Sequence, residues 1–295
     1  MKIFIFSAFM IASYAFLSLN TFLYSDTFEG KIAFIRDYKN GPHIFVLDGK
    51  DGKLKKLVRE GRNYAPKWAP NGSKIAFLSI RSGHSQEIYI LEVPGNREKR
   101  LTHTNGMVLT YRWDSKGNEI FVTSKENGII RNYIIDVGTG KRREISKELN
   151  GIKEERPIII PSPDERHQIW YYEYPHRKMS LINMLTHGKK GINFGGTPKW
   201  SKDSKKIAYF KDPSPRETMV LIDLEKNETT EIRVFKGDLD YAECGGISWS
   251  RDSEKIVYEC GPVAGPHAGE PWLYIFDLKT NKFTKLIQGS NPDWY

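Results

Sequence analysis

The sequence is poor in cysteine. It holds two cysteines in 295 residues, Cys244 and Cys260, which is too few for a cysteine-rich zinc site. The Gly-x-Ser-x-Gly turn that carries the nucleophile of α/β-hydrolases is absent, and so is the His-Glu-x-x-His motif of zinc metalloproteases. The sequence therefore offers no local motif for hydrolytic chemistry, and we expect neither a metal nor a cofactor.

Helical periodicity and blocks of basic charge are also missing. No segment of useful length after residue 25 has apolar residues at helical spacing. Basic residues outnumber acidic ones by 45 to 36, a net charge of +9, but they are interspersed. Nucleic-acid binding normally needs a clustered basic footprint, so we expect no nucleic-acid partner. The positive charge instead favours anionic surroundings such as phospholipid, lipopolysaccharide or an acidic protein.

A short phrase returns along the chain at intervals of about 40 to 50 residues. It reads Pro-Lys-Trp-Ala-Pro-Asn-Gly-Ser-Lys-Ile-Ala-Phe at 66–77 and Pro-Lys-Trp-Ser-Lys-Asp-Ser-Lys-Lys-Ile-Ala-Tyr at 198–209. Other copies are anchored by Trp113 and Trp249, and in each copy an isoleucine follows the tryptophan by seven residues. Short β segments at this period predict a propeller with one repeat per four-stranded blade. We expect the tryptophan to be structural, wedged between neighbouring blades.

Six copies fit the chain. A degenerate copy at 160–171 keeps the turn and the following strand but has Pro161 in place of the tryptophan. The last copy is split: residues 291–295 hold its first half and residues 30–34 its second. We therefore predict an all-β, six-bladed propeller over residues 25–295, closed by pairing between the N-terminal and C-terminal strands.

The N-terminus is apolar. After Lys2, residues 3–23 carry no charge, as in a secretory signal peptide, and the stretch is also long enough for an uncleaved membrane anchor. We expect residues 1–24 to be a signal peptide, with a tether through residues 3–23 as the alternative. A lipoprotein is not expected, because the first cysteine is Cys244. Either reading places the propeller in the periplasm or outside the cell.

The two cysteines fall on the two strands of one predicted hairpin. Pairing Trp249 with Ile256 places residue 244 opposite residue 261, so Cys260 is one position from facing Cys244. A bulge or a frayed strand end would bring the pair within disulfide reach, and an exported compartment would oxidise it. We expect a disulfide, with two separate buried thiols as the alternative.

The phrase Trp-Ser-x-Asp-Ser-x-x-Ile-Ala-Tyr, its six copies and the split last blade resemble the propeller repeats of TolB-like proteins. The resemblance covers residues 30–295 and implies a periplasmic propeller. TolB itself carries an α/β domain before its propeller, which engages other Tol components. About five residues separate the apolar segment from the first strand here, so the resemblance implies a TolB-like propeller without that domain.

The loops leading into each innermost strand, and those between second and third strands, should emerge on one face of the disc. Tyrosine and arginine side chains on irregular loops suit a recognition surface. We expect a monomeric, non-enzymatic protein that binds an envelope protein or an anionic envelope component there. A propeller lyase or glycosidase acting on an extracellular carbohydrate or peptide is the alternative. The candidate binding residues are Tyr64, Arg81, His84, Arg156, Tyr174, Arg177, Arg216, Tyr241, Glu243 and His267.

Overall fold

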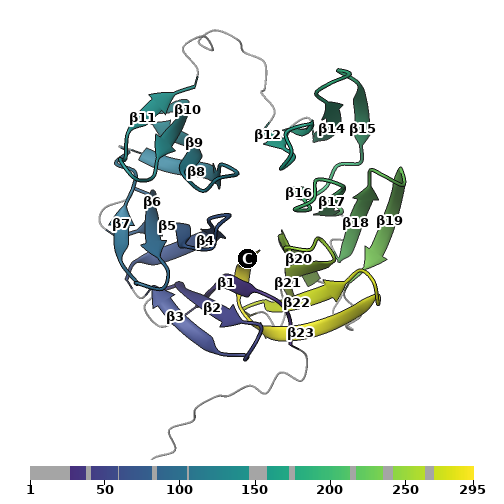
Figure 1. Cartoon of the computed structure of the whole chain (residues 1–295), viewed down its shortest axis with the longest axis horizontal. Coiled ribbons are helices and arrows are strands. Elements are labelled where there is room, and N and C mark those ends of the chain that lie inside the picture. Colours follow the sequence, from purple (N-terminus) through teal and green to yellow (C-terminus); the bar gives the residue numbers. More distant parts are fainter. Residues whose placement is uncertain are drawn as a thin grey trace, which may run out of the picture.

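Six four-stranded antiparallel sheets form a ring in the computed structural model (Figure 1). The structure describes residues 27–37, 41–58, 60–81, 85–104, 106–145, 158–172, 177–212, 217–234, 242–262 and 269–295. No helix in these ranges is long and apolar enough to cross a membrane, and the predicted signal peptide or anchor at 1–24 lies outside them. The predicted six-bladed propeller is confirmed.

The first three blades are numbered along the chain, and each is given from its innermost to its outermost strand. Blade 1 contains β24 (Ser290–Trp294), β1 (Lys31–Arg36), β2 (His43–Asp48) and β3 (Leu54–Val58). Blade 2 contains β4 (Arg62–Trp68), β5 (Lys74–Ile80), β6 (Glu87–Glu92) and β7 (Glu98–Arg100). Blade 3 contains β8 (Gly106–Trp113), β9 (Glu119–Glu126), β10 (Ile129–Asp136) and β11 (Arg142–Glu144).

The other three blades repeat this order. Blade 4 contains β12 (Ile158–Pro161), β13 (His167–Tyr172), β14 (Lys178–Asn183) and β15 (Lys189–Ile192). Blade 5 contains β16 (Lys199–Trp200), β17 (Lys206–Phe210), β18 (Thr218–Asp223) and β19 (Glu228–Arg233). Blade 6 contains β20 (Ala242–Trp249), β21 (Lys255–Pro262), β22 (Trp272–Asp277) and β23 (Lys282–Gln288).

The repeated tryptophan links neighbouring blades. In three copies, but not at Trp68 or Trp294, its indole N–H donates to the carbonyl of the residue before the equivalent position in the preceding blade: Trp113 to Lys67 (3.0 Å) and Trp249 to Lys199 (3.2 Å). Trp200 does the same with Ile160 (3.1 Å). The seven-residue spacing follows from the pairing, because each tryptophan lies opposite its isoleucine across a five-residue turn. The expected structural role of the tryptophan agrees with these contacts.

The ring closes through β24. This strand pairs with β1, so that blade 1 is built from both ends of the chain (Figure 1). The carboxylate of Asp293 accepts the backbone N–H of Trp68 in blade 2 at 2.7 Å, and the backbone N–H of Trp294 donates to the Ser248 hydroxyl in blade 6 at 3.0 Å. The C-terminal strand thus pairs with β1, as the split repeat predicts, and it also bonds to both neighbouring blades.

One seam of the ring differs from the others. The described residues form five buried apolar clusters, and each fills the space between two adjacent blades. No such cluster among them joins blades 3 and 4. Pro161 occupies the tryptophan position of blade 4 and has neither an indole ring nor an N–H to offer blade 3. The degenerate copy is therefore the place where the repeated packing is interrupted.

Candidate functional site

The two faces of the disc differ in their connections. On one face, which we call the turn face, every connection between consecutive strands is four or five residues long. On the other, the loop face, connections range from one residue at Gly289 to thirteen at 145–157. The repeat requires short turns on the turn face, whereas the connections on the loop face can vary in length and sequence. A binding surface specific to this protein can therefore form on the loop face.

Polar side chains on the turn face form hydrogen bonds within the turns and between neighbouring blades. Ser201 and Ser250 each donate to the aspartate two residues later, Asp203 and Asp252, at 2.5 Å. The Asp203 N–H in turn donates to the hydroxyl of Ser253 in the next blade at 3.1 Å. Serine and aspartate side chains in these turns therefore close the turns and join the blades.

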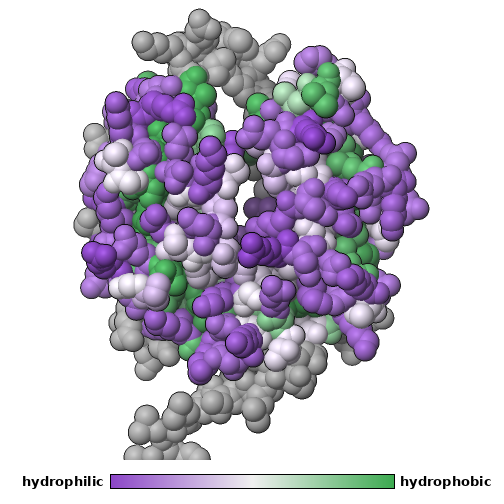
Figure 2. All heavy atoms as spheres, viewed as in Figure 1, coloured by the Kyte–Doolittle hydropathy of each residue, from purple (hydrophilic) through white to green (hydrophobic). Residues whose placement is uncertain are grey.

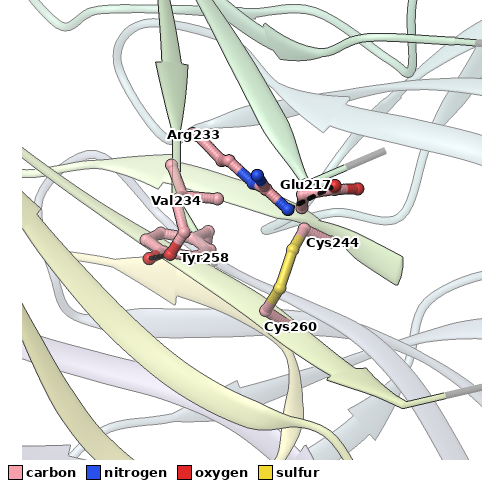
Figure 3. Close-up of a disulfide and its surroundings, with 6 residues drawn as sticks. All are labelled: Glu217, Arg233, Val234, Cys244, Tyr258 and Cys260. Atoms are coloured by element: carbon pink, nitrogen blue, oxygen red, sulfur yellow. Dashed lines mark hydrogen bonds and ion pairs between the residues drawn. A yellow bond between two sulfur atoms is a disulfide. The ribbon is translucent and has the colours of Figure 1, made fainter. Parts of the chain in front are cut away.

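On the loop face of blade 6, the disulfide predicted between Cys244 and Cys260 is present (Figure 3). The two cysteines face each other directly, rather than with the predicted offset of one residue, because a bulge between Gly245 and Ser248 shifts the register. Gly246 lies in this bulge with φ +57°, and a Cβ there would meet Glu259 and Pro292 at 2.8 and 2.9 Å. A glycine is thus needed for the bend that aligns the cysteines.

A cavity of about 320 Å³ opens beside the disulfide. Glu243 and Glu259 line it, together with Pro262 and Pro271. Burial raises the pKa of Glu259, whose carboxylate accepts the backbone N–H of Asn291. The cavity wall is therefore acidic on one side, and one of its acids is fixed to the ring-closing strand.

Ion pairs on the loop face join neighbouring blades. Glu270 accepts the backbone N–H of Asp37 at 2.8 Å and lies 3.9 Å from Nε of Arg36, which links blades 6 and 1. Burial raises the pKa of the Glu270 carboxyl. Arg177 lies 3.8 Å from the carboxylate of Asp212 and links blades 4 and 5. These contacts tie the loop ends to a rigid ring.

Four of the candidate binding residues fall in the described part of the loop face, on three different blades. Tyr64 is half-buried against the clusters on both sides of blade 2. Arg81 stacks 4.1 Å from the Tyr89 ring centroid and pairs with Glu98. Arg177 and Glu243 are placed as described above. His84, Arg156, Tyr174, Arg216, Tyr241 and His267 lie outside the described residues.

The structure also exposes apolar side chains that the sequence does not single out. Met107 and Ile130 are 47% and 54% exposed, and both are paired with Lys125, so that they share one side of blade 3. Ile145, 53% exposed, follows on the same side, since its N–H donates to Asn132. This side looks toward the seam with blade 4. The replacement of tryptophan by Pro161 was the feature of the sequence that could have indicated it.

The described residues contain no group of three or more His, Cys, Asp or Glu side chains placed to hold a metal ion. Figure 2 shows that hydrophilic residues cover most of the visible face, with apolar residues in narrow bands. Charged, partly exposed groups and a few apolar side chains are therefore what the described surface offers a partner.

Comparison with known proteins identifies similar chains. A sequence model of the TolB beta propeller domain matches residues 26–195. The protein TolB homolog of Chlorobium luteolum is 28% identical over 108 residues, which is 36% of this chain and 24% of that protein.

Solved structures agree on the fold. TolB from Acinetobacter baumannii superposes with a TM-score of 0.65 at 19% identity, over 90% of this chain and 66% of that one. An oligogalacturonate lyase from Vibrio parahaemolyticus gives 0.50 at 14% identity, over 89% and 76%. The chain thus spans less than two thirds of the two TolB proteins, and at these identities the structural likeness concerns the fold alone.

Proposed function

Because the chain belongs to the TolB β-propeller family, we propose that it is an exported, monomeric, non-enzymatic protein that binds an envelope partner through its loop face. The partner is a protein or an anionic envelope component. The contrast between the two faces carries the proposal. The turn face has short connections of nearly constant length, whereas the loop face has connections of many lengths with charged groups at their ends.

The described loop-face groups suit contact with a macromolecule. Arg177 is about half exposed and lies 3.8 Å from the Asp212 carboxylate, so this ion pair restrains the side chain before any partner arrives. Preorganised arginine at an interface loses less conformational freedom on binding. The exposed side chains of Met107, Ile130 and Ile145 add apolar area at the neighbouring seam, as protein interfaces usually require. A docking face spread over several blades agrees with the placement of Arg81, Arg177 and Glu243 on three different blades.

The disulfide supports export. Structural disulfides persist in oxidising compartments such as the periplasm and are rare in the cytosol. The apolar segment at residues 3–23 supplies a route out of the cytoplasm. The enzyme alternative would use the same fold, as the lyase neighbour does, but it requires acid and base groups that converge on one substrate. The carboxylate of Glu259 instead bonds to the backbone of Asn291.

Affinity capture from the envelope fraction tests the proposal. We expect the Arg177→Ala, Glu243→Ala double variant to lose at least tenfold of the partner retained by the wild type. The matched control is Arg166→Ala, Glu254→Ala, which removes the same charges from the same two blades on the turn face. Equal retention by both double variants would contradict a loop-face interface.

A further inference from the structure

Six residues form a ring around the central channel, one at the next-to-last position of each innermost strand. Each directly precedes the repeated tryptophan or, in blade 4, Pro161. They are Lys67, Arg112, Ile160, Lys199, Ser248 and Asp293. Successive side chains of a strand point to opposite sides, so these residues point away from the blade that the tryptophan contacts. Lys67 illustrates this, since its Nζ donates to the carbonyl of Tyr111 in the following blade at 2.5 Å.

Positive charge dominates this ring. Lys67 and Lys199 belong to blades 2 and 5, which lie opposite each other across the ring (Figure 1). Burial and then repulsion from Lys199 lower the pKa of Lys67 to about 7, and burial lowers the pKa of Lys199. Both lysines nevertheless keep part of their surface accessible, as expected of side chains on the wall of an internal channel. The ring therefore holds like charges near each other in a protein environment.

The carboxylate on the ring offsets this charge only in part. Asp293 accepts the backbone N–H of Trp68 at 2.7 Å and the hydroxyl of Ser248 at 3.3 Å. Among the described residues, no ion pair joins a carboxylate to Lys67 or Lys199. With both lysines protonated, Lys67 and Lys199 face the single carboxylate of Asp293, whereas the guanidinium of Arg112 stacks on the Phe121 ring at 3.7 Å and interacts with Glu165 and Asp114. An added anion would relieve the repulsion between the cations and would be attracted by their summed field.

We propose that the central channel binds a small divalent oxyanion of the sulfate or phosphate class between Lys67 and Lys199. Arg112 adds to the positive field at Lys67, but its guanidinium stacks on the Phe121 ring, so the two lysines supply the direct contacts. Ammonium and guanidinium groups form strong charge-assisted hydrogen bonds with such oxygens. Figure 2 shows a hollow at the centre of the disc bordered by hydrophilic residues, which gives an ion access from solvent.

Anion binding should be tighter at lower pH, because the charge of Lys67 depends on pH. The groups that face Lys67 are Tyr111 and Arg112 from β8, Lys199 from β16 and Asp293 from β24. Burial keeps the pKa of Tyr111 well above its usual value, so the phenol stays neutral. Lys67 is charged below pH 7 and neutral above it, so the channel attracts an anion more strongly at lower pH. Anion binding should in turn raise the pKa of Lys67.

Isothermal titration of the purified chain with sodium sulfate tests the site, with sodium chloride at equal ionic strength as the reference ion. Sulfate stays divalent between pH 6 and 8.5, so a change in affinity over this range reports the protein. We expect at least fivefold tighter binding at pH 6 than at pH 8.5. Lys67→Gln and Lys199→Gln should each weaken binding at pH 6 by about tenfold, and Lys67→Gln should abolish the pH dependence.

Two further variants separate this site from general attraction to a basic protein. Lys55→Gln removes the same charge from the exposed outer strand β3 and should leave sulfate affinity unchanged. Asp293→Asn keeps an acceptor for Trp68 while removing the opposing charge, and should tighten binding severalfold. Equal effects of Lys55→Gln and Lys67→Gln, or no preference for sulfate over chloride, would overturn the proposal.

A second probe distinguishes a free ion from a lipid headgroup. Phosphatidylglycerol vesicles should not compete for sulfate bound in the channel. Competition that disappears in Lys67→Gln would show that the ring binds a headgroup instead, against the proposal. The partner of the loop face is absent from these titrations, so their failure would leave the proposed function standing.

Discussion

Removal of residues 291–295 is expected to lower the melting temperature of the chain by roughly 10 °C or more. These residues form most of β24, and their loss leaves β1 as an exposed sheet edge in the centre of the ring. The truncation also removes Trp294, which is 1% exposed, and the bonds from blade 1 to Trp68 and Ser248. Loss of a buried tryptophan alone costs about 3–5 kcal/mol.

Thermal unfolding followed by circular dichroism measures the effect. A control lacking residues 1–26 has lost part of the other end of the chain and should melt close to the intact protein, since the described strands begin at Lys31. A C-terminal truncation that melts at the same temperature as the intact protein would mean that β24 does not hold the ring closed.

Trp249→Ala is expected to destabilise the chain by about 3–5 kcal/mol. Trp249 is 1% exposed in the cluster between blades 5 and 6, and its indole N–H bonds to the Lys199 carbonyl at 3.2 Å. The substitution leaves both a cavity and a carbonyl without its donor. Urea unfolding of the wild type and the variant gives the difference in the free energy of unfolding.

Trp170→Ala is the matched control for this experiment. Trp170 is half-buried on β13, outside the repeat position, and its N–H bonds to the side chain of Gln168. We expect a loss below about 1.5 kcal/mol, because less apolar area leaves the interior. Equal destabilisation of the two tryptophan variants would contradict a special role of the repeated tryptophan in the packing between blades.

The repeat predicts the ring because its spacing is a property of the fold. A tryptophan seven residues before an isoleucine requires a five-residue turn between paired strands, and the structure has this turn at Trp68 and at Trp249. The split of the last copy between the two ends predicts closure in the same way. The local sequence pattern is sufficient to predict the blades, since each blade except the one containing β24 is formed by one continuous stretch of the chain.

Features that depend on departures from the repeat were harder to predict. The bulge at Gly246 aligns Cys260 with Cys244, which is one of the two possibilities expected from the sequence; the choice between a bulge and a frayed strand end required the structure. Pro161 was visible as a missing tryptophan, but the exposed side of blade 3 that results depends on packing across the seam.

Side-chain contacts between different repeats could not be predicted from the sequence. Arg177 and Asp212 come from different repeats, and only the closed ring places them 3.8 Å apart. The ring of Lys67, Lys199 and Asp293 is a similar case, because its members meet only across the channel. The candidate site therefore rests on the structure wherever it involves more than one blade.

Site-specific photo-crosslinking in living cells tests the proposed binding function most directly. A photoreactive amino acid would be placed at exposed positions of the loop face: Arg62, Ile129 and Glu243. The control positions are exposed residues of the turn face: Lys116, Lys226 and Arg251. We predict a discrete crosslinked species from at least two loop-face positions and none from the turn face. The same species from turn-face positions alone, or no species from either face, would contradict a protein-binding loop face.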